Sequence, residues 1–568
     1  MNNRESRTLK QVLNHSVEEH ADHPALSMVD ESPITYRELG EQVRTLSNIL
    51  YKRGVVAGDR VAILSENQPN WGVSYFAITT MGAVAVPVLP DFHANEVHHI
   101  LRHSAAKAIF ISEKQYQKLE DTDIESLQTI FLIEDFSVIS ADTRIDRLKN
   151  VLRDGQREYA RLKEAALKMA GRLPQDVQED DVASIIYTSG TTGHSKGVVL
   201  SHKNLVFDAM ATIEIQDVTP RDRLLSVLPL SHTYENTVGF IIPMMRGASI
   251  YYLDKPPVAR VLLPALEKIK PTIMLTVPLI IEKIYKMRIL PRFTGSALMR
   301  HLYSKPVFRK RLNRVAAKKV LKMFGGELHF FGIGGALLAP EVELFLRDGN
   351  FPYAIGYGLT ETSPIVAGCG PLVTRYRSTG PALPGVEVRI HDPHPDSGEG
   401  EIWVRGDNVM QGYYNDPERT AEVIDVDGWF RTGDLGVLDA DGYLYIKGRL
   451  KNLILGPSGE NIYPEEIESI INKSDMVLES LVYQEQGQLM ARVHLNYEEL
   501  DKEFKSRKLT ESQIAQQIQQ KLQDLRKEVN ANVSSFSRLN QIIEQPEPFE
   551  KTPTKKIKRY LYVSQKVE

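Results

Sequence analysis

Short apolar runs that alternate with helical patterns are the feature of this chain that most constrains its fold. One such run, Arg60–Leu64, follows a stretch in which Thr35 and Glu38 form a predicted capping box. Apolar residues at helical spacing continue from there to Gly54, which is placed to end the helix. Strands separated by helices predict an α/β fold with parallel sheets built from βαβ units. Further strand-like runs cover 82–87, 106–112, 182–187, 224–228, 248–253, 272–277 and 328–333.

The pattern changes near residue 385 and again near 448. Short strand-like runs punctuated by glycine predict a small β-rich subdomain over about 385–448. The remainder has the pattern of a separate α+β unit, in which Thr510 and Gln513 form a second capping box and apolar residues recur at helical spacing from Ile514 to Val529. We therefore expect an N-terminal domain over 1–448 and a small C-terminal domain over 449–568.

Charge and cysteine content exclude several classes of protein. The 568 residues include 69 Lys and Arg against 73 Asp and Glu, a formal charge of −4, which argues against a dedicated nucleic-acid-binding protein. The single cysteine, Cys369, excludes an internal disulfide and a cysteine-based metal site, which favours a reducing compartment. No run approaches the ~18 apolar residues that cross a bilayer, and residues 1–10 lack the apolar stretch of a secretory signal. We expect a cytoplasmic protein, with weak peripheral contact to a membrane left open.

A loop rich in glycine and hydroxyl groups follows the run 182–187. Its sequence over 187–197, YTSGTTGHSKG, lets backbone N–H and side-chain O–H groups surround phosphate oxygens without obstruction, and Lys196 adds a positive charge. The spacing GxxGxxKG differs from the GxxxxGK[ST] loop of the usual NTPases, and no GxGxxG dinucleotide motif occurs in a suitable context. The alternative, a flexible linker, is disfavoured by the apolar runs on both sides. The loop residues expected to bind phosphate are Thr188, Ser189, Gly190, Thr191, Thr192, Gly193 and Lys196.

This loop and four later blocks resemble, in order, the adenylate-forming superfamily of acyl-CoA synthetases, adenylation domains and luciferases. The later blocks are YGLTE (357–361), WFRTGDLG (429–436), GRLKNLILGPSGENIYPEEIE (448–468) and TPTKKIKR (552–559). The resemblance covers most of the chain and is closest to long-chain fatty-acid:CoA ligases. It implies a reaction in two halves, in which a carboxylate and ATP give acyl-AMP and pyrophosphate, and a thiol then takes the acyl group. It also implies Mg²⁺ as cofactor, with a fatty acid, ATP and CoA as substrates.

The resemblance implies an ATP site assembled from these blocks. Two anions meet in the first half-reaction, so positive charge has to converge on the α-phosphate, and Lys556 is implied for that role. Lys555 stands where the family usually has glycine, which leaves Lys555 as the alternative. Glu361 is implied to hold Mg²⁺ together with Thr188, because Mg²⁺ prefers oxygen ligands. The other implied ATP ligands are Gly335, Ala336, Tyr357, Gly358, Thr360, Asp434 and Arg449.

Lys451 lies where the family places a hinge. A mobile C-terminal domain would present Lys556 for the first half-reaction and a different face for attack by the thiol, as gating motions require.

The block LPLSHTYENTVGF (228–240) resembles the border of the family's acid site. His232 resembles the gating aromatic residue of acyl-CoA ligases, whereas members that activate amino acids usually carry Asp there, so an amino acid is disfavoured. Apolar side chains behind it are expected to line an acyl channel, where each buried methylene contributes ~0.8 kcal/mol. The same side chains could equally be plain core. They are Val238, Phe240, Ile241, Ile242 and Leu279.

The resulting interpretation is an AMP-forming ligase of medium- to long-chain fatty acids and CoA. A variant of it passes the acyl group to an acyl carrier protein or stops at acyl-AMP, and the sequence does not distinguish these acceptors. An alternative of another class is a catalytically silent acyl- or nucleotide-binding protein. No nucleic-acid partner is expected.

We expect Lys556→Ala to abolish acyl-AMP synthesis and to leave conversion of supplied acyl-AMP into thioester intact, because only the first half-reaction brings two anions together. Separate chromatographic assays of the two half-reactions measure this. Lys555→Ala is the matched control. If Lys555→Ala has that phenotype and Lys556→Ala does not, the assignment is displaced by one residue.

Overall fold

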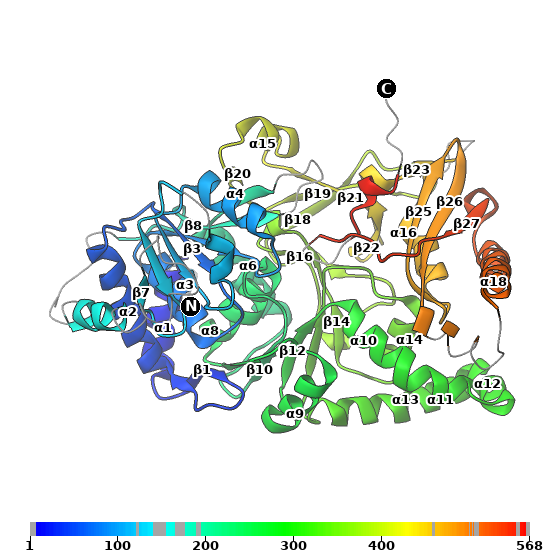
Figure 1. The fold of residues 1–568 in the computed structure, drawn as a ribbon, viewed down its shortest axis with the longest axis horizontal. Helices are drawn as coiled ribbons and strands as arrows, with labels where there is room; N and C mark the ends of the chain where they lie inside the picture. The colour runs from blue at the N-terminus through cyan, green and yellow to red at the C-terminus, as the bar shows by residue number, and fades with distance from the viewer. Residues whose placement is uncertain are drawn as a thin grey trace. The chain divides into compact units, whose positions relative to one another are not determined.

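The computed structural model describes residues 7–120, 124–139, 155–164, 176–188, 195–456, 461–498, 500–501, 504, 510–552 and 557–563. The chain forms two compact units, which are described separately. The larger comprises Met1–Arg389, Trp403–Arg431 and Asp439–Leu444, and the smaller comprises Ile390–Ile402, Thr432–Leu438 and Tyr445–Glu568. The division passes through four strands that Figure 1 labels: β18 (Glu387–His391), β19 (Gly400–Arg405), β21 (Phe430–Leu438) and β22 (Tyr443–Arg449).

An eight-stranded sheet lies in the larger unit, in the order β20-β9-β8-β4-β3-β5-β6-β7. Strands β8, β4, β3, β5 and β6 are parallel, and β9, β20 and β7 run antiparallel to their neighbours. Helices α2 (Tyr36–Lys52), α3 (Pro69–Thr80) and α4 (Ala94–Ser104) connect or flank these strands. The strands are β3 (Arg60–Leu64), β4 (Val84–Val88), β5 (Ala108–Ile111), β6 (Thr129–Leu132), β7 (Val138–Ile139), β8 (Val182–Thr188), β9 (Lys196–Ser201) and β20 (Gly412–Tyr413).

A seven-stranded sheet in the same unit has the order β14-β13-β12-β10-β11-β1-β2 and is parallel except for β2. Its side chains pack with the helices that connect its strands, as βαβ units require. The strands are β1 (Pro24–Met28), β2 (Ile34–Thr35), β10 (Arg223–Ser226), β11 (Ser249–Tyr252), β12 (Ile273–Thr276), β13 (Phe330–Ile333) and β14 (Tyr353–Ile355).

Two local signals explain how the first long helix begins and ends. The predicted capping box at Thr35 and Glu38 is present and starts α2, while Gly54, with φ of +80°, follows its end. Helix α3 is buried almost throughout, and the rings of Trp71 and Tyr75 stack at 5.3 Å. Phe240 stands edge-on to both rings, at 6.1 and 6.0 Å. This aromatic cluster ties α3 to the segment that follows His232.

Between β12 and β13 the chain makes a run of helices that pack on one another. They are α10 (Pro278–Ile284), the π-helical turn η3 (Tyr285–Ile289), α11 (Leu290–Thr294), α12 (Ala297–Ser304) and α13 (Pro306–Met323).

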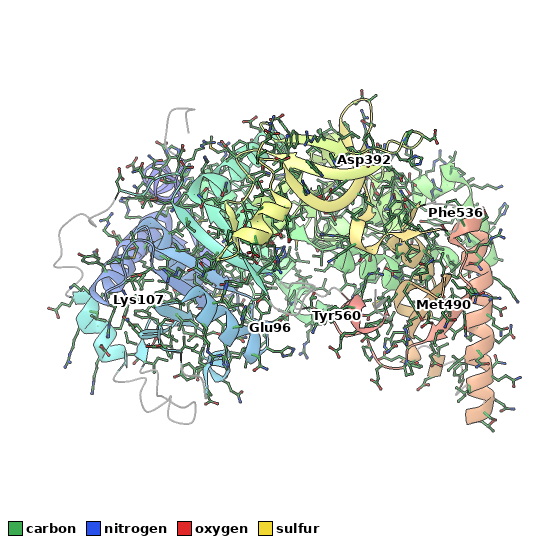
Figure 2. All side chains as sticks on the ribbon, turned by 90° about the horizontal axis from the view of Figure 1, so that it is seen from above. Glu96, Lys107, Asp392, Met490, Phe536 and Tyr560 are labelled. Carbon is green, nitrogen blue, oxygen red and sulfur yellow. The ribbon has the colours of Figure 1, made fainter. Side chains whose placement is uncertain are left out.

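In the smaller unit, β25 (Val477–Glu485) and β26 (Gln488–Leu495) form an antiparallel hairpin, and β27 (Gln541–Glu544) runs parallel to β26. Figure 2 labels Met490 on β26, which is buried beside Phe549. Helices α16 (Pro464–Ile471) and α18 (Glu511–Ala531) share one core with this sheet. The predicted capping box at Thr510 is present, and the apolar stripe of α18 packs on its own sheet as expected.

The predicted α/β fold class is confirmed, with parallel sheets in a large unit and a small α+β C-terminal unit. The boundary at 448/449, the subdomain over 385–448 and the mobility of the C-terminal part stay predictions. Of the helices in the described residues, none combines the length and apolarity that a membrane span requires.

We expect Phe240→Ala to lower the free energy of unfolding by about 3–5 kcal/mol, because it leaves a cavity inside the aromatic cluster. Urea unfolding followed by the fluorescence of Trp71 and the other two tryptophans measures the change. Leu372→Ala is the control, since Leu372 is 100% exposed and its truncation should stay within about 0.5 kcal/mol. Unchanged stability with a changed preference for acyl-chain length would instead make Phe240 a wall of a ligand pocket.

Candidate active site

The glycine-rich sequence lies between β8 and β9, two antiparallel strands of the eight-stranded sheet. Thr188, at the end of β8, is paired with Lys196, at the start of β9. The hydroxyl of Thr188 is buried and has no hydrogen-bond partner among the described residues. An unsatisfied buried hydroxyl is expected where a ligand supplies the missing partner. Five predicted phosphate ligands lie outside the described residues, namely Ser189, Gly190, Thr191, Thr192 and Gly193.

Lys196 forms a cluster with Glu361 and Tyr413. Its ammonium group lies 3.1 Å from Oε1 of Glu361, a carboxylate that is only 8% exposed as a residue. Oη of Tyr413 donates to the same carboxylate oxygen at 3.0 Å, and Lys196 in turn donates to that Oη. The ammonium also stands 4.0 Å from the centroid of the Tyr413 ring, which is cation–π geometry. Two blocks 165 positions apart, at 196 and 361, therefore meet at one charge pair, in which the carboxylate is buried and the lysine is half-buried.

The phenol of Tyr413 stays a hydrogen-bond donor in this cluster. Burial, followed by the neighbouring charge of Glu361, raises the pKa of Tyr413 far above its ordinary value. The short strand β20 positions the side chain, because Tyr413 pairs with Val198 of β9, two residues after Lys196. A carboxylate that accepts from a cation and a phenol is fixed in orientation before any ligand arrives.

Backbone contacts anchor the YGLTE block beside this cluster. The carbonyl of Glu361 accepts from the N–H of Met410 at 2.9 Å, and the hydroxyl of Ser363 donates to the carbonyl of Asn408 at 2.8 Å. The N–H of Ile365 donates at 3.0 Å to Asp208, a buried carboxyl whose pKa burial raises well above its ordinary value. The turn that carries Glu361, η4 (Thr360–Thr362), is thus held from two sides.

Gly358 has a requirement of its own within that block. A Cβ there would lie 1.7 Å from the carbonyl oxygen of Pro364, so any other residue would break the hairpin of β15 (Tyr357–Gly358) and β16 (Ile365–Ala367). The expected role of Gly358, close approach to adenine, stays a prediction. The close contact with Pro364 is by itself enough to require a glycine at this position.

Several predicted ligands gather at the carboxyl ends of neighbouring parallel strands. Tyr357 follows β14, Gly335 and Ala336 form an exposed turn after β13, and Leu279 follows β12. His232 follows β10, the next strand of the sheet. In open α/β sheets, ligands bind at this edge. Thr360 is half-buried one residue before Glu361, beside the same edge.

The acid-site block (228–240) contacts both the turn after β13 and the YGLTE turn. The ring of Tyr234 fills the space where Gly334 would have a side chain, with atoms 3.2 Å from that Cβ position. Two residues from it, Nδ1 of His232 accepts from the N–H of Tyr234 at 3.3 Å. The hydroxyl of Thr237 donates to the carbonyl of Ser363 at 2.8 Å, next to the Glu361 turn.

The residues predicted to line an acyl channel have different surroundings. Phe240 and Ile241 are fully buried in the main core, with Ile242 at 2% exposure beside them. Val238 is half-buried and packs against the same core, while Leu279 is 51% exposed on α10. Their assignment to an acyl channel stays a prediction.

In the smaller unit, Asp434 and Arg449 form a pair of their own. The guanidinium of Arg449 lies 2.7 Å from Oδ1 of Asp434, whose side chain is nearly buried. Lys451 is exposed in the short turn η6 (Leu450–Asn452) that follows β22. Asp434 is oriented further by a bond from its own N–H to the hydroxyl of Thr432 at 3.0 Å.

Lys555 and Lys556 lie outside the described residues. Before and after them in the sequence, Lys551 and Ile557 form an isolated antiparallel bridge. Just beyond it, the guanidinium of Arg559 binds both carboxylate oxygens of Glu468, at 2.6 and 2.5 Å. The described residue Arg559, three positions after Lys556, is therefore tied to α16 of the C-terminal core.

Within the part of the chain that the structure describes, no group of three or more His, Cys, Asp or Glu side chains could hold a metal ion. Mg²⁺ in phosphate sites is usually bound by one or two carboxylates plus substrate oxygens and water. The buried carboxylate of Glu361 and the unsatisfied hydroxyl of Thr188 supply oxygen donors of that kind.

Tyr413 is the residue of this cluster that the sequence interpretation missed. Its signal is weak, because a GYY triplet in a loop region resembles ordinary turn and edge-strand sequence. Only the pairing of β20 with β9 shows that its side chain reaches the lysine–glutamate pair.

An α/β fold in which a glycine-rich sequence between two strands is followed by a lysine paired with a buried carboxylate is typical of proteins that bind phosphorylated ligands. Comparison with known families then gives a specific match. The family model described as AMP-binding enzyme matches residues 13–414. The chain therefore belongs to the AMP-binding enzymes, and it is a ligase of the adenylate-forming superfamily, as the five sequence blocks indicate.

Curated relatives and solved structures agree with this family. A Rhodococcus jostii protein, 3-[(3aS,4S,7aS)-7a-methyl-1,5-dioxo-octahydro-1H-inden-4-yl]propanoyl:CoA ligase, is 32% identical over 79% of this chain and 80% of its own length. The long-chain-fatty-acid–CoA ligase heimdall of Drosophila melanogaster is 29% identical over 82% of this chain and 73% of its own. The crystal structure of ATP-bound MatB from Rhodopseudomonas palustris has the same fold, with a TM-score of 0.74, 24% identity and 98% coverage of each chain.

We expect Glu361→Gln to weaken binding of Mg²⁺–ATP at least tenfold, since the amide keeps the bond from Tyr413 but loses the charge that a metal ion and Lys196 both need. Calorimetric titration of the full chain with Mg²⁺–ATP measures the affinity. Glu387→Gln is the control, because Glu387 forms an exposed pair with Arg405, and it should bind as the wild type does. Equal affinities for Glu361→Gln and the control would remove Glu361 from the nucleotide site.

Proposed function

We propose that this chain is an AMP-forming ligase that joins medium- to long-chain fatty acids to CoA. The observation that carries the proposal is the pair of Lys196 with the buried carboxylate of Glu361. Lys196 directly follows the glycine-rich sequence, and Glu361 belongs to the anchored YGLTE turn. A cation for phosphate and a carboxylate for Mg²⁺ are thereby held side by side, which is what a Mg²⁺-bound triphosphate needs.

In the first half-reaction a carboxylate oxygen of the acid attacks the α-phosphorus of ATP. The new P–O bond gives acyl-AMP, and the bond to the β-phosphate breaks to release pyrophosphate. Lys196 would bind phosphate oxygens from the base of the hairpin, and Lys556 would neutralise charge as the two anions meet. Bound Mg²⁺ would neutralise phosphate charge, held by Glu361 and Thr188.

In the second half-reaction the CoA sulfur attacks the acyl carbonyl carbon. The thioester bond forms, and the bond to AMP breaks, so that AMP leaves with the electron pair. Rotation of the C-terminal part about Lys451 would separate the two half-reactions. Asp434 and Arg449 would bind the ribose hydroxyls, Tyr357 would cover the adenine, and Gly335, Ala336, Gly358 and Thr360 would complete the nucleotide contacts.

The nature of the acid is supported by His232 and by the names of the relatives. A neutral or partly charged imidazole is a poor partner for an ammonium group, so a carboxylic acid without an α-amine fits better. One relative is named for long-chain fatty acids and another for a bulky bicyclic propanoate. Both names describe acids with a large hydrocarbon part, which agrees with an apolar acyl channel beside His232.

CoA is the proposed acceptor, and the phosphopantetheine of an acyl carrier protein is the alternative that the same chemistry allows. The cytoplasmic location and the absence of a nucleic-acid partner stay predictions from composition and charge.

Incubation of the purified chain with ATP, Mg²⁺, CoA and a series of fatty acids tests the proposal. We expect AMP and pyrophosphate in equal amounts, with thioester yield highest at one medium or long chain length. Because each buried methylene adds ~0.8 kcal/mol, kcat/KM should rise by a factor of about four per methylene up to that length. Formation of ADP, or nucleotide binding without turnover of any acid, would contradict the proposal.

A further inference from the structure

The helical run between β12 and β13 carries an extreme charge. Residues 283–326 include thirteen lysines and arginines and no Asp or Glu, in a chain whose formal charge is −4. A basic amphipathic helix is typical of a surface that binds a membrane or a partner. The net charge of the whole chain does not indicate this run, because acidic residues elsewhere cancel its positive charge.

Three of these thirteen cations lie on one face of α13. Arg311, Lys318 and Lys322 recur at helical spacing, and all three are exposed. None of these three forms an ion pair with any residue that the structure describes. Arg309 differs, since it points inward and lies 3.0 Å from Asp348. The outer cations are therefore not needed to hold α13 in place.

Exposed apolar side chains are interspersed with these cations. Val307 and Val315 bracket Arg311 at spacings of four residues on the same face of α13, and they are 65% and 58% exposed. Exposed apolar side chains are unfavourable in water, and their burial in a lipid interface lowers the free energy of the system. The other exposed apolar residues of the run are Met287 (76%), Leu298 (68%) and Phe308 (46%).

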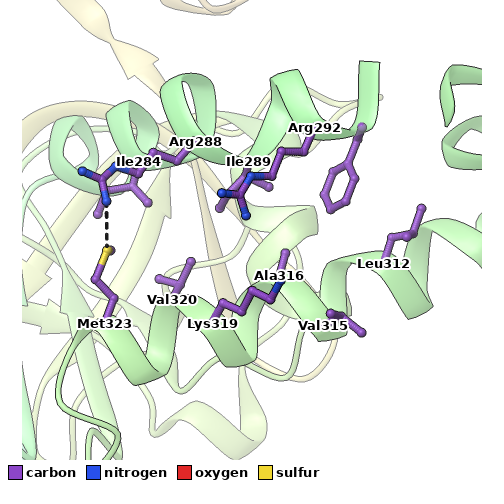
Figure 3. A pocket seen from close by; sticks show the side chains of 11 residues that line it. Ile284, Arg288, Ile289, Arg292, Leu312, Val315, Ala316, Lys319, Val320 and Met323 are labelled. Carbon is purple, nitrogen blue, oxygen red and sulfur yellow. Dashed lines mark hydrogen bonds between the residues drawn. The ribbon is translucent and has the colours of Figure 1, made fainter. Parts of the chain in front are cut away.

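A groove of about 380 Å³ runs between α13 and the segment α10–η3–α11 (Figure 3). Its walls are mainly apolar, with Ile284 and Ile289 on one side and Val320 on the other. Arg288 and Arg292 stand on the first wall, and the guanidinium of Arg288 donates to Sδ of Met323 at 3.6 Å. An apolar groove with cations at its rim is complementary to an anionic lipid, because the lipid has an apolar body and a charged head group.

We propose that α10–α13, with η3, form a docking surface for an anionic lipid bilayer. Phosphate head groups would pair with the cations of α13, and the exposed apolar side chains would enter the interface. Nucleic acid is the competing polyanion, but its backbone offers nothing to exposed aliphatic side chains, whereas a bilayer offers them burial. The proposal is independent of the ligase chemistry, since binding to vesicles requires no turnover.

Sedimentation of the full chain with vesicles tests this surface. We expect binding to phosphatidylcholine vesicles that contain about 30% phosphatidylglycerol, little binding to pure phosphatidylcholine, and release at about 0.5 M NaCl. The triple variant Arg311→Glu, Lys318→Glu, Lys322→Glu should lose roughly a hundredfold in affinity, from about one kcal/mol per cation. Arg44→Glu, Lys52→Glu, Arg102→Glu is the matched control, with the same charge change on exposed positions of α2 and α4. It should bind as the wild type does.

A second variant separates lipid from other polyanions. Met287→Ser, Val307→Ser, Val315→Ser should weaken vesicle binding at least fivefold and leave retention on heparin unchanged, because heparin senses charge alone. Circular dichroism melts check that every variant is folded. Equal vesicle binding by the two charge-reversal triples would overturn the proposal, and so would unchanged vesicle binding by the apolar variant or equal binding of the wild type to neutral vesicles.

Discussion

The contact between Lys196 and the buried carboxylate of Glu361 is the interaction on which the rest of the site depends. A carboxylate removed from water is costly unless it has a partner, and here it accepts from the half-buried Lys196 and from Tyr413. The contact holds the strands β8 and β9 against the YGLTE turn. Because Lys196 pairs with the carboxylate that we propose as a ligand of Mg²⁺, binding of a Mg²⁺-bound phosphate would require both charges to exchange partners.

Much of the fold follows from local signals in the sequence. The strand expected at Arg60–Leu64 is found with the same bounds, and the capping boxes at Thr35 and Thr510 each start the helix that they predict. These signals are strong because each depends on neighbouring residues only: a hydroxyl and a carboxylate or amide three residues apart, or an unbroken apolar run in a buried strand. The parallel sheets follow from the same alternation, since helical crossovers leave few other arrangements.

The site was predicted less completely, because its contacts join distant segments. Lys196 and Glu361 were each identified from their own motif, but nothing in either motif shows that the two side chains touch, and Tyr413 had no motif at all. Phe240 illustrates the converse, since an apolar residue beside a ligand motif has the same appearance whether it lines a channel or packs with Trp71 in the core. The net charge does not indicate the basic run over 283–326, because it sums over the whole chain and acidic residues elsewhere cancel the thirteen cations.

The most direct measurement is a crystal structure of the full chain with Mg²⁺ and a non-hydrolysable ATP analogue. We expect the carboxylate of Glu361 to leave Lys196 and bind the metal ion, Nζ of Lys196 to move onto a phosphate oxygen, and Tyr413 to keep its bond to Glu361. A nucleotide bound elsewhere, with the contact of Lys196 and Glu361 unchanged, would contradict this expectation.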